Sequence, residues 1–493
     1  MSISLYVGTT TQSCRAVLPI SVGDDATLAV CSNFSLLPPL FVKRCGGWHV
    51  WPEMTHEYHD KLILGGGVTG LAAGIASGAT VLEAGDRPGG ICSSYYVRRN
   101  VPGRIDSPGE DGEAYRFEHG GGHWIFGGHS DVVAIVQALA PCDSIERVSS
   151  VFFPGEKRYV GFPLQHHLRQ LAPEIATRAV DEVMSATARR EASTMAQWLE
   201  EQFGPTLADL FFHPFHEAYT AGLWREIAPQ DGYKTPLDLQ QVLRGAQGDA
   251  KPAGYNVRFL YPRDGLDALI GALAERTQLH CGQRVVAIDP VSRELTLDSG
   301  RTLRYRRLLS TLPLNHLLAL CGIANPIPPD PYTSVLVLNI GAERGPLCPD
   351  DHWLYIPRSD SGFHRVGFYS NVCRHFLPRS LREGRQACSM YVERSYRCGQ
   401  KPTTDEMAQY IESTVRELRE WGFIGSVEAL DSSWVEVAYT WSRPGSTWAK
   451  AAMAALSQHE IQVAGRYARW AFQGITDSLR DGFLAGQALR VCD

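Results

Sequence analysis

A short apolar run that ends in closely spaced glycines constrains this chain more than any other feature of its sequence. Residues 61–64, Lys-Leu-Ile-Leu, are typical of a strand, and residues 71–77 follow at helical period. Between them lie three glycines, Gly65, Gly67 and Gly70. The first permits a tight turn, the second lets backbone amides approach a pyrophosphate, and the third lets helix and strand pack closely. The phosphates would then meet the positive end of a helix dipole.

The segment after this helix carries the second mark of an adenine dinucleotide site. Residues 79–83 are typical of another strand, which ends in the acid Glu83. A carboxylate about 20 residues beyond the first glycine is the group expected to bind a ribose hydroxyl. The pattern therefore predicts that this chain binds an adenine dinucleotide.

Composition and charge narrow the classes of protein that fit. The 493 residues suggest two or three domains, at about 100 to 200 residues each. Forty-seven Lys and Arg against 53 Asp and Glu give a net charge of −6, which favours neither nucleic acid nor an anionic surface as a partner. The sequence has no apolar run of the roughly 18 residues that an integral membrane segment needs. The 12 cysteines form no C-x-x-C pair, so we expect no metal site and a cytoplasmic protein with free thiols.

Two further segments resemble FAD enzymes of the amine oxidase and UDP-galactopyranose mutase superfamily. A second glycine turn, Gly89 and Gly90, follows the ribose acid directly, where those enzymes place a turn along the pyrophosphate and flavin. Residues 465–486 resemble their last strand and helix, whose N-terminus faces the flavin pyrimidine ring. The resemblance implies that the cofactor is FAD. It also implies further cofactor contacts from Val285, Gly465, Arg466 and Asp481.

The same resemblance implies an α/β fold in which a Rossmann-type FAD-binding domain is interleaved with a helical subdomain and a mixed-sheet substrate domain. Local patterns predict a capped helix over 193–203, a hairpin over 284–298, strands at 334–339, 366–370 and 389–392, and a helix over 404–421. The expected boundaries are 1–58 for an N-terminal tail, 59–130, 256–320 and 456–493 for the FAD-binding segments, 131–255 for the helical subdomain, and 321–455 for the mixed-sheet domain.

Several stretches resemble UDP-galactopyranose mutase more than a generic amine oxidase. The glycine-rich loop around His123 resembles the loop whose histidine lies against the isoalloxazine ring. Tyr355 and Arg365 match a segment that holds a tyrosine and an arginine over the substrate diphosphate, and an arginine fork suits a phosphate. Asn256 falls where that family has an active-site asparagine. The resemblance therefore implies that these four residues are catalytic.

The implied substrate contacts depart from that family. Phe162 and Gln165 match a segment that lines the nucleotide pocket, but His216 and Thr220 replace the asparagine and tryptophan near the uracil. The family's second diphosphate arginine has no match, and Phe472 replaces an active-site tyrosine. The expected substrate-binding set is Phe162, Gln165, His216, Tyr219, Trp434 and Phe472.

Two functions fit this sequence. The first is a mutase-like isomerase that interconverts pyranose and furanose forms of a nucleotide-sugar-like substrate with reduced flavin. The second is an FAD-dependent oxidoreductase of the amine oxidase, protoporphyrinogen oxidase or desaturase type, with Trp441 joining an aromatic cage around a more apolar substrate. Either would use a small-molecule substrate together with an external reductant or O2.

Overall fold

The computed structural model describes residues 57–185, 192–230, 237–248 and 257–491, and the backbone of two short antiparallel strands, β1 (Ile3–Tyr6) and β2 (Arg15–Leu18). Most of the predicted tail, residues 1–58, lies outside this part of the chain, and so does Asn256. The domain boundaries stay a prediction.

One sheet forms the predicted dinucleotide-binding part of the molecule. Its strands are β12 (Gln278–His280), β4 (Thr80–Leu82), β3 (Glu57–Leu64), β15 (Thr302–Ser310), β14 (Glu294–Leu297) and β13 (Val285–Asp289), in that order, with β21 (Ile461–Val463) also paired to β15. Strands β12, β4, β3, β15 and β21 are parallel, whereas β13 and β14 form the predicted antiparallel hairpin. Residues 62–64 of β3 are buried, as expected of a parallel strand that is covered on both faces.

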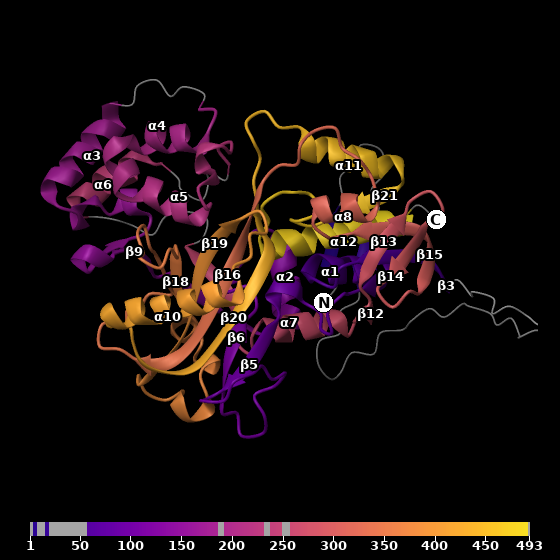
Figure 1. Ribbon diagram of the computed structural model, residues 1–493, viewed down its shortest axis with the longest axis horizontal. Helices are drawn as coiled ribbons and strands as arrows, with labels where there is room; N and C mark the ends of the chain where they lie inside the picture. Colours follow the sequence, from indigo (N-terminus) through magenta and orange to yellow (C-terminus); the bar gives the residue numbers. More distant parts are fainter. Residues whose placement is uncertain are drawn as a thin grey trace, which may run out of the picture.

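Two helices from opposite ends of the chain pack together on this sheet. Helix α1 (Val68–Ser77) follows the first glycine turn, and α12 (Ile475–Val491) ends the described chain. Leu71 and Ala72 of α1 share one hydrophobic core with Leu479 and Phe483 of α12. Figure 1 shows the yellow C-terminal helix lying alongside the indigo N-terminal one. The two segments predicted to close on one cofactor are therefore neighbours.

A second, mixed sheet contains strands from three separate stretches of sequence. Its order is β10 (Arg158–Gly161), β9 (Ser149–Phe153), β17 (Trp353–Tyr355), β18 (Arg365–Phe368), β19 (Ala387–Arg397), β16 (Tyr332–Arg344) and β20 (Ile424–Thr440). The predicted strands at 334–339 and 389–392 are parts of β16 and β19. The strand predicted over 366–370 is too long, because α9 (Tyr369–Val372) begins there. Helix α10 (Thr404–Glu420) confirms the helix predicted at that place and packs against the sheet through Tyr410 and Leu418.

A cluster of helices covers one end of this sheet (Figure 1). It contains α3 (Pro173–Ser185), α4 (Met195–Leu207), α5 (His213–Tyr219) and α6 (Leu239–Gln247). Helix α4 begins at the capping box of Thr194 and Gln197, which confirms the predicted capped helix. Between α4 and α5 the chain forms one π-helical turn, Ala208–Phe212. Such turns inside helices are frequent at functional sites.

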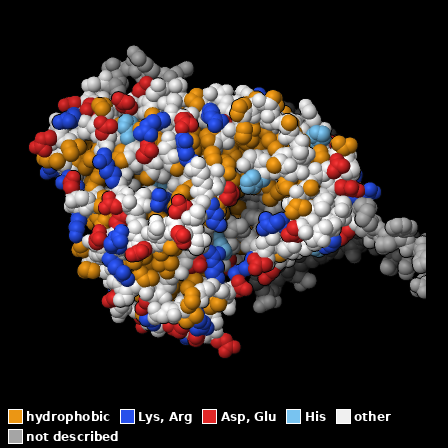
Figure 2. Space-filling view, viewed as in Figure 1, with side chains coloured by type: hydrophobic (Ala, Val, Ile, Leu, Met, Phe, Trp, Pro, Cys, Tyr) orange, Lys and Arg blue, Asp and Glu red, His pale blue; other side chains and the backbone are white. Residues whose placement is uncertain are grey.

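Further strands and helices lie around the two sheets. Strands β5 (Ser94–Arg98) and β6 (Ala114–Glu118) form a ribbon, and β7 (Ile125–Phe126), β11 (Arg258–Pro262) and β8 (Cys142–Glu146) form a three-stranded sheet. The helices that accompany them are α2 (Ser130–Leu139), α7 (Leu266–Ala274), α8 (Leu314–Leu320) and α11 (Trp448–Gln458). Among the described helices, none has the length and apolarity needed to cross a membrane. On the face drawn in Figure 2, basic and acidic side chains are interspersed, in keeping with the small net charge.

Candidate active site

A cavity of about 640 Å³ lies where the two sheets and the helical cluster meet. Most of the residues predicted from the sequence line it. They are Gly65, Gly67, Gly89, Gly90, His123, Phe162, His216, Tyr219, Tyr355, Arg365, Trp434, Gly465, Arg466 and Phe472. The fold thus gathers residues from both ends and the middle of the chain around one space.

The first glycine turn has the shape that a pyrophosphate site needs. A Cβ atom on Gly70 would lie 1.9 Å from the carbonyl oxygen of Gly65, so only glycine lets α1 begin this close to β3. A Cβ atom on Gly67 would meet no atom within 4 Å, which leaves open space above the N-terminus of α1. The second glycine turn is tied to the first, because the Gly89 amide donates to the Gly66 carbonyl at 2.8 Å. An anion can approach this helix end closely.

Glu83 and Val285 lie beside this turn without lining the cavity. The Glu83 carboxylate accepts hydrogen bonds from the amides of Gly66 at 2.6 Å and Gly85 at 2.8 Å. The Gln283 amide donates to the Glu83 carbonyl at 2.8 Å, which brings the segment before Val285 to the end of β4. The acid is therefore at the strand end that the sequence pattern requires, and it holds the glycine turn in place.

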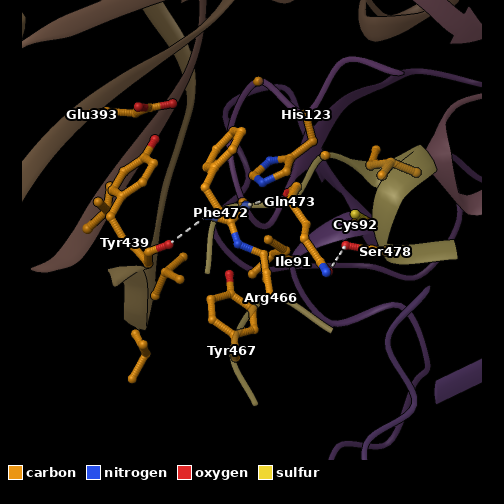
Figure 3. A pocket seen from close by; sticks show the side chains of 18 of the residues that line it. Ile91, Cys92, His123, Glu393, Tyr439, Arg466, Tyr467, Phe472, Gln473 and Ser478 are labelled. Carbon is orange, nitrogen blue, oxygen red and sulfur yellow. Dashed lines mark hydrogen bonds between the residues drawn. The ribbon is translucent and has the colours of Figure 1, made fainter. Parts of the chain in front are cut away.

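The C-terminal segment closes the other side of the cradle. The Gly465 amide donates to Asp481 Oδ2 at 2.7 Å, and Arg469 pairs with the same carboxylate at 2.8 Å. Arg466 donates to the carbonyl oxygens of Ala438 at 3.1 Å and Gln473 at 3.4 Å (Figure 3). Asp481 thus acts from behind the cavity wall, where it fixes the turn that positions Arg466.

His123 lies on a glycine loop that faces this segment (Figure 3). A Cβ atom on Gly122 would lie 2.0 Å from the Tyr391 hydroxyl, so the loop passes directly over β19. Burial, together with the nearby charge of Arg466, lowers the pKa of His123 to about 4. Its Nδ1 is buried and accepts or donates no hydrogen bond within the described residues. The ring is therefore neutral at physiological pH.

The substrate side of the cavity holds a buried ion pair. Arg365 Nη1 lies 3.0 Å from Glu393 Oε2, and the Arg365 guanidinium lies 5.6 Å from the centre of the Tyr355 ring. His364 Nε2 is 3.6 Å from the same carboxylate oxygen. Burial alone would raise the pKa of Glu393, but Arg365 and His364 together bring it below its ordinary value. Glu393 is therefore ionised beside the arginine that the sequence assigned to a diphosphate.

Aromatic side chains form the rest of this wall. The Phe162 and Tyr355 rings lie 4.3 Å apart, and Tyr219 lies 5.0 Å from Tyr439 and 5.5 Å from Trp441. The π-helical turn adds further apolar lining from Phe211 and Phe212. This surface suits an apolar ligand.

Other predicted residues bond within the protein or lie outside the cavity lining. His216 lines the cavity, but its Nδ1 contacts the Phe212 carbonyl oxygen at 2.7 Å, and burial lowers its pKa to about 4. Trp434 lines the cavity and donates to Glu436 at 2.6 Å. Gln165 is fully buried and does not line the cavity, so the expected direct contact with a nucleotide base finds no support.

Three residues that line the cavity were not predicted from the sequence: Tyr391, Glu393 and Tyr439. A signal was present, because Tyr391 and Glu393 are two residues apart on a strand and so share one face. The alternation alone did not reveal that this face meets Arg365, since that depends on the register of β18 against β19.

Comparisons with known proteins agree with this geometry. Residues 71–489 match the family model described as flavin containing amine oxidoreductase. A structure of reduced UDP-galactopyranose mutase superposes with a TM-score of 0.75 at 22% identity, over 88% of this chain and 96% of that one. A protein from Exiguobacterium assigned as a protoporphyrinogen oxidase gives 0.64 at 15% identity over 89% and 99%. A redesigned putrescine oxidase gives 0.54 at 14% identity over 88% and 99%. At these identities the likeness shows the fold alone.

Proposed function

Since this chain belongs to the family of flavin-containing amine oxidoreductases and its cofactor is FAD, we propose that it oxidises a small, largely apolar substrate. The aromatic wall opposite the flavin cradle carries this proposal. Phe162, Tyr219, Tyr355 and Trp441 offer apolar surface to a ligand, and they lie on the same cavity as the glycine turns. Bound FAD would accept a hydride and pass its electrons to an external acceptor such as O2.

The residues of this chain would hold the cofactor and position the substrate. The open space at Gly67 and the N-terminus of α1 would take the pyrophosphate, and the ring of His123 would lie beside the flavin as a neutral group. The aromatic residues would exclude water from the reacting carbon and orient it. Arg466 would keep the last cofactor-binding turn in register with β20.

A mutase-like reaction is the second candidate. It is favoured by Tyr355 and Arg365, which lie together on the substrate side as the resemblance to UDP-galactopyranose mutase implies. It is disfavoured by Glu393, which forms an ion pair with the arginine that a diphosphate would need.

One experiment separates the two functions. The purified FAD-loaded protein is mixed anaerobically with panels of amines and of dihydro-substrates, and the flavin absorbance near 450 nm is followed. We expect bleaching with an apolar member of a panel and its reversal on admission of O2. In parallel, protein reduced with dithionite is incubated with UDP-galactopyranose and assayed for furanose product. Furanose formation without bleaching by any panel member would refute the oxidoreductase proposal.

A further inference from the structure

Four charged side chains line the described cavity, and their charges sum to zero. Arg365 and Arg466 are positive, whereas Glu393 and Glu436 are negative. Arg466 belongs to the cofactor side, where it holds the carbonyl oxygens of Ala438 and Gln473. On the substrate side, the arginine that could bind an anion is therefore the one paired with a carboxylate.

The pairing of Arg365 with Glu393 is built into the sheet. The two residues stand directly opposite each other on the antiparallel strands β18 and β19. Their side chains therefore lie on the same face, and the Glu393 side chain is only 4% exposed. His364 adds a second contact to the same oxygen of the carboxylate. A carboxylate held in this way cannot swing aside to free the guanidinium for a ligand.

The pair nevertheless has groups left for a ligand. Both contacts of the Glu393 carboxylate use Oε2, so that Oε1 is not engaged by either of them. Arg365 and Glu393 both line the cavity, so a donor and an acceptor stand side by side on its wall. A neutral hydroxyl or amide can use both, whereas a phosphate would meet an ionised carboxylate.

We propose that Glu393 sets the charge preference of this site: it excludes phosphate-bearing ligands and, with Arg365, binds an uncharged hydroxyl or amide group of an otherwise apolar substrate. This inference rests on the proposed oxidoreductase function and names its substrate class. Glu393 would be a specificity-determining residue rather than a base, because its role requires no proton transfer.

The wild-type protein provides the first test. Affinities of UDP and uridine for the FAD-loaded protein are measured by titration calorimetry at pH 8. The two ligands share the base and ribose and differ in the diphosphate. If Glu393 neutralises Arg365, UDP should bind no more tightly than uridine. Binding of UDP at least tenfold tighter than uridine would overturn the inference.

Variants then ask whether Glu393 is the cause. Glu393→Gln keeps the shape of the side chain but frees the charge of Arg365, so UDP should bind at least tenfold more tightly than to wild type. Glu436→Gln is the matched control, because it removes one exposed carboxylate from the same cavity without touching Arg365. Its UDP affinity should stay within threefold of wild type. The double variant Glu393→Gln/Arg365→Gln should lose the gain.

The possible outcomes distinguish a failure of this inference from a failure of the proposed oxidoreductase function. Equal UDP affinities of Glu393→Gln and Glu436→Gln would refute the role of Glu393, whatever the enzyme oxidises. Flavin absorbance confirms that each variant is loaded and folded, and the wild-type comparison of UDP with uridine needs no variant. If no compound bleaches the flavin while Glu393→Gln still gains UDP affinity, the proposed function fails and the charge preference stands.

Discussion

Gly67 and Gly70 lie three residues apart, yet replacement by alanine should impair cofactor binding at the first and folding at the second. Gly67 has an extended backbone conformation that alanine adopts without strain, and a Cβ atom there meets nothing within 4 Å. At Gly70 the same atom would lie 1.9 Å from a backbone carbonyl oxygen. The first substitution should therefore affect only the ligand, and the second should affect the fold.

The expected sizes follow from these contacts. Gly67→Ala should leave the apoprotein unchanged or stabilise it by up to ~1 kcal/mol, because the unfolded chain loses freedom. Its methyl group would keep the pyrophosphate from one or two backbone amides, each contributing about 1.5–3 kcal/mol to a charged acceptor, so FAD should bind at least tenfold more weakly. Gly70→Ala should cost about 1–3 kcal/mol or more by overpacking.

The assay compares the apoproteins first and the FAD affinities second. Thermal unfolding of apo Gly67→Ala should match wild type, whereas apo Gly70→Ala should melt lower by ~2–4 °C per kcal/mol lost in a domain of this size. FAD binding is then measured by quenching of flavin fluorescence. Wild-type affinity of Gly67→Ala for FAD would contradict this prediction, and so would a wild-type melting temperature of apo Gly70→Ala.

Substitutions at three further residues test other parts of the structure. Burial lowers the pKa of His166 to about 4, so the unfolded chain takes up a proton first as the pH falls below ~6.5, and stability is lost between there and pH 4. His166→Leu should lose less stability over this pH range, by on the order of 3 kcal/mol. The prediction is contradicted if the melting temperatures of the two proteins fall equally as the pH is lowered. Asp481→Ala removes the acceptor of the Gly465 amide, at about 1–3 kcal/mol, and should release FAD on gel filtration; full retention of FAD would count against the assigned role. Tyr219→Ala should raise KM for an apolar substrate about tenfold with kcat little changed, whereas Tyr219→Phe keeps the ring and should raise KM less.

The cofactor half of the fold could be predicted because its signals are local. Spacing of Gly65, Gly67 and Gly70 and the acid at Glu83 describe one strand, turn, helix and strand in a row. The structure contains these elements, with β3 beginning earlier than the apolar run suggested. The C-terminal helix was recognised by resemblance, since nothing in residues 475–491 alone indicates that they pack on α1.

The substrate half was predicted less completely. Strand β20 is 17 residues long, yet it was not predicted, because Asp431, Ser432 and Ser433 interrupt its apolar pattern. Gln165 was assigned to the pocket by the resemblance of residues 160–165 to a nucleotide-binding segment, but it is buried in a short helical turn and does not line the cavity. Glu393 could be found only with the register of two strands in hand.

The cofactor half of the site was predicted more completely than the substrate half because the two halves are formed by different kinds of groups. The cofactor cradle is made largely of backbone amides, a helix end and the absence of Cβ atoms, and a few glycines within one short segment specify all three. The substrate wall is made of side chains from β17, β18, β19, β20 and α5, whose meeting depends on the whole fold. Substitution of a single wall residue, such as a carboxylate opposite Arg365, can reverse the charge preference while the fold stays unchanged. Family membership therefore identifies the cofactor of this protein, and its substrate has to be inferred from the wall itself.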